Sequence, residues 1–423
     1  MTSPSFISLD DLDFSRIVRP GDGVIWSQVT GEPTPLTTRL MEQRKFIGSF
    51  SIFLGASFSE TVTPEHADCV RIAAIGGVGA NKRLSAAKKL EILPIHISAV
   101  PQYIEEGLIP SDVAIVQIAP SEEKGFYEYA VTSDYIVTAV ERARVVIGEL
   151  NAAAPRTRGA IRIPSERLNF IVETNRPVLS VAARPLNDTE TTIARNVAHY
   201  IGDEAVLQMG IGAIPDGILD LLADRRNLGV HSGMIGDGIV DLMQRGVITN
   251  ACKPRDRGLT VTGNLVGTEK LYRFADNNPE ILMHTVRHTH GADVLASMSN
   301  LISINSAIEV DLSGQVNSEE IGGVNIGAAG GQVDYVRGAH RAKGGRSIIA
   351  LSSVAGKMKK SRIVSRLSGP VTTARSDVDI IVTEFGAAEL RGRSLPQRAE
   401  AMIAIAHPDV RDELSAYARK ILD

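Results

Sequence analysis

Two consecutive strand-turn-helix patterns, each with glycines at its turn, constrain the fold of this chain most. Residues 205–208 form a short apolar run that ends before Gly210, and apolar residues return at helical spacing in 213–223. Gly210 and Gly212 bring backbone N–H groups to the start of that helix, where unpaired donors and the helix dipole favour a negatively charged oxygen. The turn alone is also compatible with a purely structural role.

Length and composition favour a soluble protein of two domains. A chain of 423 residues suits two domains of about 200 residues, and we place them at 1–185 and 186–423. The 45 basic and 49 acidic residues form no long block of one sign, which argues against nucleic acid as a partner. No stretch has the roughly 18 consecutive apolar residues of a membrane helix. The start lacks a secretory signal, so we expect a cytoplasmic protein in which Cys69 and Cys252 are free thiols.

The order of apolar runs predicts an α/β fold. We expect strands at 49–58, 70–75, 92–98, 113–119, 205–208, 259–264, 301–310 and 378–383, and helices at 35–46, 101–107, 136–151, 188–201, 213–223, 266–274, 396–405 and 408–422. Ser313-Gly314 is a hairpin signal. This count predicts two similar open α/β domains with largely parallel sheets. Because such folds bind ligands at the carboxyl ends of their strands, we expect the active site at the domain interface.

Two further motifs have competing interpretations. The cluster Gly76-Gly77-Val78-Gly79 lacks the Lys-Ser/Thr of a P-loop and the spacing of a dinucleotide fingerprint, so a structural or substrate-facing loop is favoured over a nucleotide site. His284, His288 and His290 have a spacing that could hold zinc. Their one nearby acidic residue is Asp293, so we predict a satisfied or exposed histidine cluster and no metal.

Three segments carry a resemblance to a known family. Residues 210–215, 229–238 and 305–317 resemble the class I CoA-transferases of the acetyl-CoA hydrolase/transferase and 4-hydroxybutyrate CoA-transferase group, and 383–392 and 406–408 are also typical of it. The resemblance implies that coenzyme A is bound as a substrate and that the protein is a homo-oligomer. It assigns coenzyme A contacts to Gly233, Asn325, Gly327, Gly330, Gly331 and Ala339. Lys357 is a plausible phosphate contact or part of a solvated loop.

One position departs from the family pattern. The nucleophilic glutamate of these enzymes sits between the Ser and Met of a His-Ser-x-Met stretch, and this chain has Gly233 there. We predict that Glu60, after the strand at 49–58, replaces it, because a branch related to itaconate and butyrate CoA-transferases brings its glutamate from an equivalent strand end. Glu60 could instead be a charge pair or a loop-ordering acceptor. Glu309 and Glu384 are rival nucleophiles.

The thioester oxygen also needs a partner. Gln208 is the natural side-chain amide to hold it, with the N–H groups of Gly210 and Gly212 in support, although a structural role for Gln208 stays open. His231 could be a base, but a histidine within a buried strand is more often packed and hydrogen-bonded.

The predicted function follows from these assignments. We expect transfer of coenzyme A between a short acyl-CoA and a short carboxylic acid of the itaconate, succinate or butyrate type, through a glutamyl-CoA thioester on Glu60. One alternative is an acyl-CoA thioesterase in which Glu60 activates water. Another is a non-catalytic protein that binds coenzyme A, because Gly233 cannot act as the nucleophile.

Overall fold

The computed structural model describes residues 3–356 and 360–422, which form two compact units. The chain leaves the first unit after Ala182, close to the boundary expected after residue 185. It returns there twice, because Val261–Thr289 and Val324–Gly330 also belong to the first unit. The second unit contains Ala183–Thr260, His290–Gly323 and the rest of the chain from Gly331. Sequence position alone therefore does not assign a residue to a unit.

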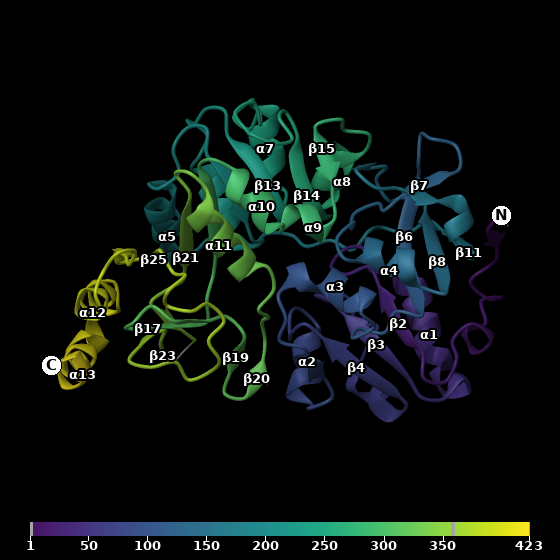
Figure 1. Ribbon diagram of the computed structural model, residues 1–423, viewed down its shortest axis with the longest axis horizontal. Coiled ribbons are helices and arrows are strands. Elements are labelled where there is room, and N and C mark those ends of the chain that lie inside the picture. Colours follow the sequence, from purple (N-terminus) through teal and green to yellow (C-terminus); the bar gives the residue numbers. More distant parts are fainter. Residues whose placement is uncertain (1–2, 357–359, 423) are drawn as a thin grey trace. The chain divides into compact units, whose positions relative to one another are not determined.

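The first unit is built on a parallel sheet (Figure 1). Its strands lie in the order β1 (Ser5–Phe6), β11 (Phe170–Thr174), β8 (Val145–Asn151), β6 (Val113–Pro120), β2 (Gly23–Trp26), β3 (Phe50–Leu54), β4 (Val70–Ala74) and β5 (Glu91–Ile92), and every pair along this path is parallel. The short β7 (Phe126–Glu128) and β10 (Ile163–Pro164) add antiparallel pairs beside β6.

Alternation of apolar side chains explains why this sheet is covered on both faces. On β2, Val24 packs in one core cluster and Ile25 in another, and on β3 the same holds for Ile52 and Phe53. Successive strand residues point to opposite faces, so both faces of these strands are buried. The covering helices are α1 (Thr34–Ile47) in one cluster and α3 (Val100–Glu105) and α4 (Ile136–Arg142) in the other.

The remaining elements of the first unit surround this sheet or come from the returning segments. They are α2 (Asn81–Ala86), β9 (Arg158–Gly159), most of β14 (Thr260–Leu265), α8 (Glu269–Ala275), β15 (Ile281–Met283), α9 (Val286–Thr289) and β20 (Val324–Asn325). β15 pairs with β9 in parallel.

The second unit has its own mostly parallel strands. They lie in the order β26 (Gly386–Glu389), β25 (Ile380–Thr383), β21 (Arg346–Ala350), β16 (Leu301–Asn305), β12 (Val206–Met209) and β13 (Gly229–Ile235), and only the β25–β26 pair on this path is antiparallel. The helices are α5 (Asp188–Ala198), α6 (Ala213–Asp220), α7 (Gly238–Gln244), α10 (Ala292–Ser297), α11 (Gln332–Arg341), α12 (Leu395–Ala404) and α13 (Arg411–Leu422). The predicted α/β class with largely parallel sheets is confirmed.

A small sheet confirms the predicted hairpin. β17 (Glu309–Asp311) and β18 (Val316–Asn317) are antiparallel, and β24 (Ile363–Val364) lies on the other side of β17. The Asp311 carboxylate accepts from the N–H groups of Ser313 and Gln315, which closes the turn.

Three sequence-based expectations were wrong in detail. The predicted long helix at 136–151 ends at Arg142, and β8 follows it from Val145, because the run Val145-Val146-Ile147 is β-branched and buried in the parallel sheet. The strand expected at 92–98 shrinks to β5, after which a short 3-10 helix covers Ile97–Ala99. The strand at 301–310 is divided into β16 and β17.

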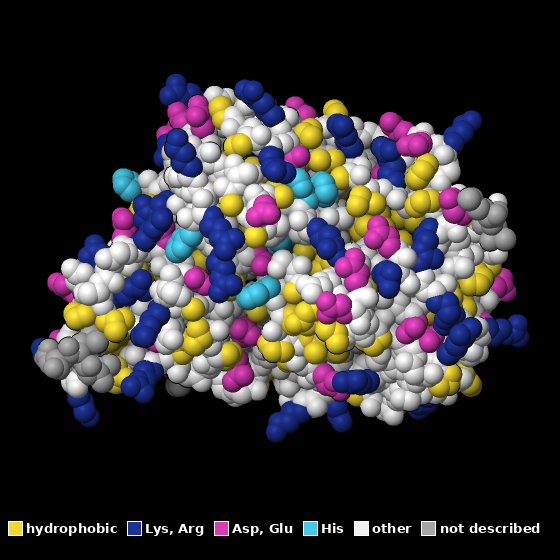
Figure 2. Space-filling model, in the orientation of Figure 1, with side chains coloured by type: hydrophobic (Ala, Val, Ile, Leu, Met, Phe, Trp, Pro, Cys, Tyr) yellow, Lys and Arg dark blue, Asp and Glu magenta, His cyan; other side chains and the backbone are white. Residues whose placement is uncertain are grey.

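Charge on the surface agrees with the composition. On the face drawn in Figure 2, basic and acidic side chains are interspersed and neither sign forms a large continuous patch. Among the helices of residues 3–356 and 360–422, none combines the length and apolarity needed to cross a membrane.

Candidate active site

The loop after β3 presents the predicted nucleophile to solvent. Glu60 is 70% exposed, and its carboxylate lies 2.7 Å from a guanidinium nitrogen of Arg83 on α2, which is 63% exposed. The carboxylate is therefore accessible and forms an ion pair. Both interpretations given above for Glu60, a nucleophile and a charge pair, are compatible with this geometry.

The loop that carries Glu60 is held by a buried carboxylate that the sequence analysis missed. Glu32 is 2% exposed and accepts from the Ser57 hydroxyl (3.0 Å), the Phe58 N–H (2.5 Å), and the Ser59 N–H (3.0 Å) and hydroxyl (2.6 Å). Burial raises the pKa of the Glu32 carboxyl, and the hydrogen bonds from Ser59, Phe58 and Ser57 oppose that shift. The backbone directly before Glu60 is therefore fixed.

The glycine cluster at 76–79 has a structural role in the first unit. The Gly77 N–H donates to the Gly327 carbonyl (2.8 Å) and to the Asn325 side-chain oxygen (2.6 Å). A Cβ at Gly76 would lie 2.1 Å from the backbone oxygen of Gly327, and a Cβ at Gly77 would lie 1.9 Å from the backbone oxygen of Asn325. Glycine is required because two backbone segments touch there. Gly330, with φ +52°, ends the same segment, and its carbonyl accepts from Ile97 (2.9 Å).

The other predicted coenzyme A contacts lie in the second unit or outside the described residues. Gly331 precedes α11 and is partly exposed. Ala339 is 0% exposed, because its methyl group packs in the core with Val206 and Tyr335, so it offers no surface to a ligand. Lys357 lies outside the described residues.

Gln208 lies at the end of β12 with its side-chain oxygen fixed. That oxygen accepts from the Ser303 hydroxyl (2.7 Å) and from the Asn305 amide (3.1 Å), both on the neighbouring β16. Among the residues that the structure describes, the Gln208 amide nitrogen has one partner, the side-chain oxygen of Asn305 at 3.4 Å. Ser303, which the sequence analysis did not single out, thus orients the amide so that its N–H₂ group is the end left to donate.

The turn after β12 is open. A Cβ at Gly210 or Gly212 would meet nothing within 4 Å, and Gly212, with φ +117°, precedes α6 without any side-chain cap. Asp216 lies in the first turn of this helix. Burial, together with the charges of Asp237 and Asp220, raises the pKa of Asp216 to about 6. The turn offers room and helix-end donors to a negatively charged group.

The space beside Gly233 is filled by a histidine. Gly233 is buried on β13, and a Cβ there would lie 2.5 Å from Cε1 and 2.9 Å from Nε2 of His290. The His290 ring packs on Tyr335 with ring centroids 4.7 Å apart, and burial lowers the pKa of His290 to about 3, so the ring is neutral. Within the second unit, the position that carries glutamate in the resembling family therefore has no open surface for a side chain or for coenzyme A.

The two rival glutamates are tied to backbone and hydroxyl donors. Glu309 is 5% exposed and accepts from the Ser368 N–H (2.6 Å) and hydroxyl and from the Asn317 amide (3.1 Å). Glu384 accepts from the Ser353 N–H (2.9 Å) and hydroxyl (2.6 Å). These contacts give both carboxylates a role in ordering loops of the second unit.

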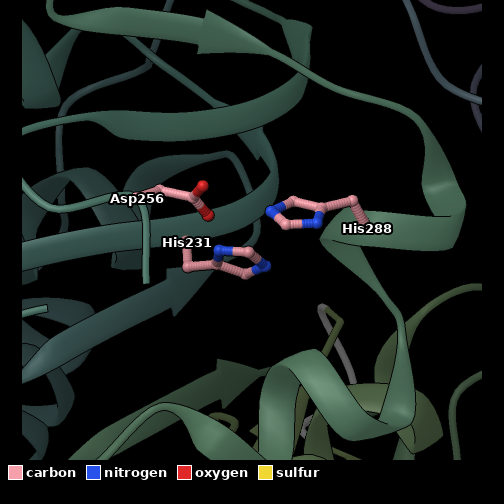
Figure 3. A group of neighbouring side chains, drawn as sticks. All are labelled: His231, Asp256 and His288. Atoms are coloured by element: carbon pink, nitrogen blue, oxygen red, sulfur yellow. The ribbon is translucent and has the colours of Figure 1, made fainter. Parts of the chain in front are cut away.

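Two of the three histidines that the sequence places near one another are in contact. His284 and His288 of the first unit stack with ring centroids 3.9 Å apart, whereas His290 belongs to the second unit. Figure 3 shows the side chains of His231, on β13, and Asp256, which both belong to the second unit. His231 is 0% exposed, and one of its ring nitrogens lies within 4.8 Å of an Asp256 carboxylate oxygen. The buried ring agrees with the packed role expected for a histidine in a strand.

Comparison with known proteins places this geometry in a family. Residues 10–182 match the acetyl-CoA hydrolase/transferase N-terminal domain, and residues 267–418 match the C-terminal domain of the same name. A 4-hydroxybutyrate coenzyme A transferase of Clostridium kluyveri is 40% identical over 401 residues, which are 94% of each chain. A butyryl-CoA:acetate CoA-transferase of Anaerostipes caccae is 38% identical over 77% of this chain and 76% of its own.

Solved structures agree with the sequence relatives. RipA from Yersinia pestis superposes with a TM-score of 0.92 at 32% identity, covering 99% of this chain and 98% of its own. The 4-hydroxybutyrate CoA-transferase of Porphyromonas gingivalis gives a TM-score of 0.83 at 33% identity, covering 98% and 97%. The predicted resemblance is confirmed at the level of the family, and its itaconate branch stays a prediction. The chain belongs to the acetyl-CoA hydrolase/transferase family.

Proposed function

We propose that the protein is an enzyme that transfers coenzyme A between a short acyl-CoA and a short carboxylic acid, with Glu60 as the nucleophile. The observation that carries this proposal is the difference between the candidate carboxylates. Glu60 is exposed at the end of a rigid loop, whereas hydroxyl and N–H donors occupy Glu309 and Glu384. Only an accessible carboxylate can attack a thioester of a large substrate.

The proposed chemistry has two halves. The Glu60 carboxylate attacks the acyl carbonyl of the donor, and coenzyme A leaves as a thiolate, giving a mixed anhydride. The thiolate then attacks the Glu60 carbonyl of the anhydride, which releases the first acid and leaves a glutamyl-CoA thioester. The acceptor acid runs the same steps backwards and departs as the new acyl-CoA.

Gln208 is proposed to donate to the oxygen that becomes negative in these steps. The contacts of its own oxygen with Ser303 and Asn305 support this role, because they leave the N–H₂ group as the donating end of the amide. The open glycines Gly210 and Gly212 beside it support the same assignment. Preorganised donors of this kind stabilise developing oxyanions without reorganising during the reaction.

The acid class comes from the relatives. Their names refer to 4-hydroxybutyrate, to butyryl-CoA with acetate, and, for a protein of Geobacter metallireducens, to succinyl-CoA with cyclohexane-1-carboxylate. We propose succinate- and butyrate-type acids as substrates here, and itaconate as a further member of that class.

Trapping of the thioester tests the proposal. The enzyme is loaded with acyl-CoA and treated with borohydride, and peptide mass spectrometry locates the reduced glutamyl residue. We expect the mark on Glu60 and none in Glu60→Gln. Glu91→Gln is a matched control, because Glu91 is also an exposed glutamate paired with an arginine of the first unit. A mark on another residue would refute the assignment. Thiol release that does not depend on an added acid would identify a thioesterase instead.

A further inference from the structure

The partner of Glu60 suggests how the second substrate is recognised. We propose that Arg83 binds the attacking carboxylate of the acceptor acid once Glu60 has become a thioester. This inference rests on the proposed nucleophilic role of Glu60. It assigns a substrate-binding residue that the sequence analysis did not identify, since no motif includes Arg83.

Buried contacts join the two backbone segments that carry Glu60 and Arg83. The Glu60 loop is anchored on Glu32, as described above. The start of α2 is tied to the same loop, because the Ala80 N–H donates to the Ser57 carbonyl (2.8 Å) and the Asn81 amide donates to the Gly55 carbonyl (2.7 Å).

A glycine lets these backbones approach. Gly79 has φ +68°, and a Cβ there would lie 2.0 Å from the Ser57 oxygen. The loop and the helix therefore form one rigid platform, on which the 2.7 Å contact between Glu60 and Arg83 is the exposed end.

The chemistry changes the charge at this contact. In the free enzyme the Glu60 carboxylate neutralises the Arg83 guanidinium. A glutamyl thioester carries no charge, so the guanidinium loses its partner when the intermediate forms. The group that must react next is a carboxylate, and it must approach the Glu60 carbonyl carbon closely. A planar guanidinium is well suited to hold a carboxylate.

The Glu60–Arg83 ion pair is weak enough for Arg83 to exchange Glu60 for the carboxylate of an acid. Ion pairs between exposed side chains contribute little to stability, so Arg83 can change partner without a large cost to the fold. As the acid's oxygen bonds to the Glu60 carbonyl carbon, the carbon–sulfur bond breaks and coenzyme A leaves as a thiolate. The thiolate then attacks the acyl carbonyl of the anhydride and releases the Glu60 carboxylate, which can pair with Arg83 again. Arg83 holds each acid carboxylate in turn and is not consumed.

Separate measurement of the two half-reactions tests the proposal. The full-length Arg83→Met enzyme is loaded with acyl-CoA, and formation of the Glu60 thioester is followed by quenched-flow mass spectrometry. The loaded enzyme is then mixed with succinate or butyrate, and loss of the thioester is followed. We expect discharge to be slower by about tenfold with both acids. Loading should be slowed less, because the substitution also removes the ion pair that stabilises the Glu60 carboxylate of the free enzyme. Arg83→Lys should recover part of the discharge rate, because it keeps the charge but not the planar fork.

The ion pair between Arg71 and Glu91 provides the control for this experiment. Arg71→Met removes a similarly exposed arginine from its pair with Glu91 and should leave both half-reactions unchanged. Unchanged discharge in Arg83→Met would overturn the inference. Slowing confined to succinate would also overturn it, because Arg83 would then bind the distal carboxylate. Absence of any Glu60 thioester in wild type would instead overturn the proposed function.

Discussion

At the scale of single residues, Gly233 shows that a missing side chain need not leave an empty space. From the sequence alone, one would expect glutamate at position 233 to restore the family's usual nucleophile. The structure predicts the opposite, because a Cβ would lie 2.5 Å from the His290 ring, whose neighbour is Tyr335. Overpacking of this kind destabilises a fold by about 1–3 kcal/mol.

We therefore expect Gly233→Glu to lower the midpoint of urea unfolding and to add no transfer activity. The double variant Gly233→Glu/His290→Ala should regain part of the lost stability, because the ring that blocks the new side chain is gone. Urea titration of the single and double variants measures both effects. An equally unstable double variant would show that His290 is not the obstacle.

The raised pKa of Asp216 predicts how the free energy of unfolding depends on pH. Its pKa is raised to about 6 from an ordinary value of 3.8, so the folded protein binds this proton more tightly than the unfolded chain does. Its contribution favours folding in acid and is lost as the pH rises through about 6. Asp216→Asn, which is neutral at every pH, should therefore be more stable than wild type at about pH 8, by about 1–2 kcal/mol, and equal to it near pH 4. Unfolding titrations at both values check the sign, and a stabilisation that is the same at both would contradict it.

At the scale of elements, the loop after β3 depends on one carboxylate. Glu32→Ala would leave the Phe58 and Ser59 N–H groups without their acceptor, which costs about 2 kcal/mol for each buried donor that stays unpaired. We expect these two amides to exchange with solvent faster while the amides of β3 stay protected, and coenzyme A transfer to fall. Hydrogen exchange measured by mass spectrometry tests the local effect.

Glu149→Gln is the control for this experiment. Glu149 is 0% exposed, and it pairs with Arg176 elsewhere in the first unit. It should lower stability without changing exchange at Phe58 and Ser59. If both variants raised the exchange rates of the Phe58 and Ser59 amides equally, Glu32 would not be the residue that orders this loop.

The elements also show what a sequence can and cannot predict. The start of the helix expected at 188–201 was predicted correctly, because Asn187 and Glu190 form a capping box whose two partners lie within one turn. The helix ends at Ala198. The helix expected at 136–151 was wrong beyond Arg142, because a short apolar run is compatible with both a helix and a buried strand. Pairing within the parallel sheet makes the residues from Val145 a strand. The role of Glu32 escaped because its partners follow it by 25 to 27 residues. His290 escaped for the same reason, since nothing local connects it with Gly233.

At the scale of the whole molecule, the first unit is discontinuous in sequence. A fragment of residues 1–182 would lack β15 and the 324–330 segment, and would leave Gly76 and Gly77 without the backbone that covers them. We expect this fragment to lack a cooperative unfolding transition, although it spans the matched N-terminal domain. Circular dichroism during heating tests this, and a sharp transition would show that the returning segments are dispensable.

The contact of Gly76 and Gly77 with residues 324–330 also bears on how the chain is made. Domains usually fold as units while they emerge from the ribosome. Here the N-terminal half must wait for Gly330 before its last backbone partner is translated. During that interval the Gly77 N–H lacks the two acceptors that it has in the finished fold, so the first unit cannot complete its hydrogen bonds before this segment is made.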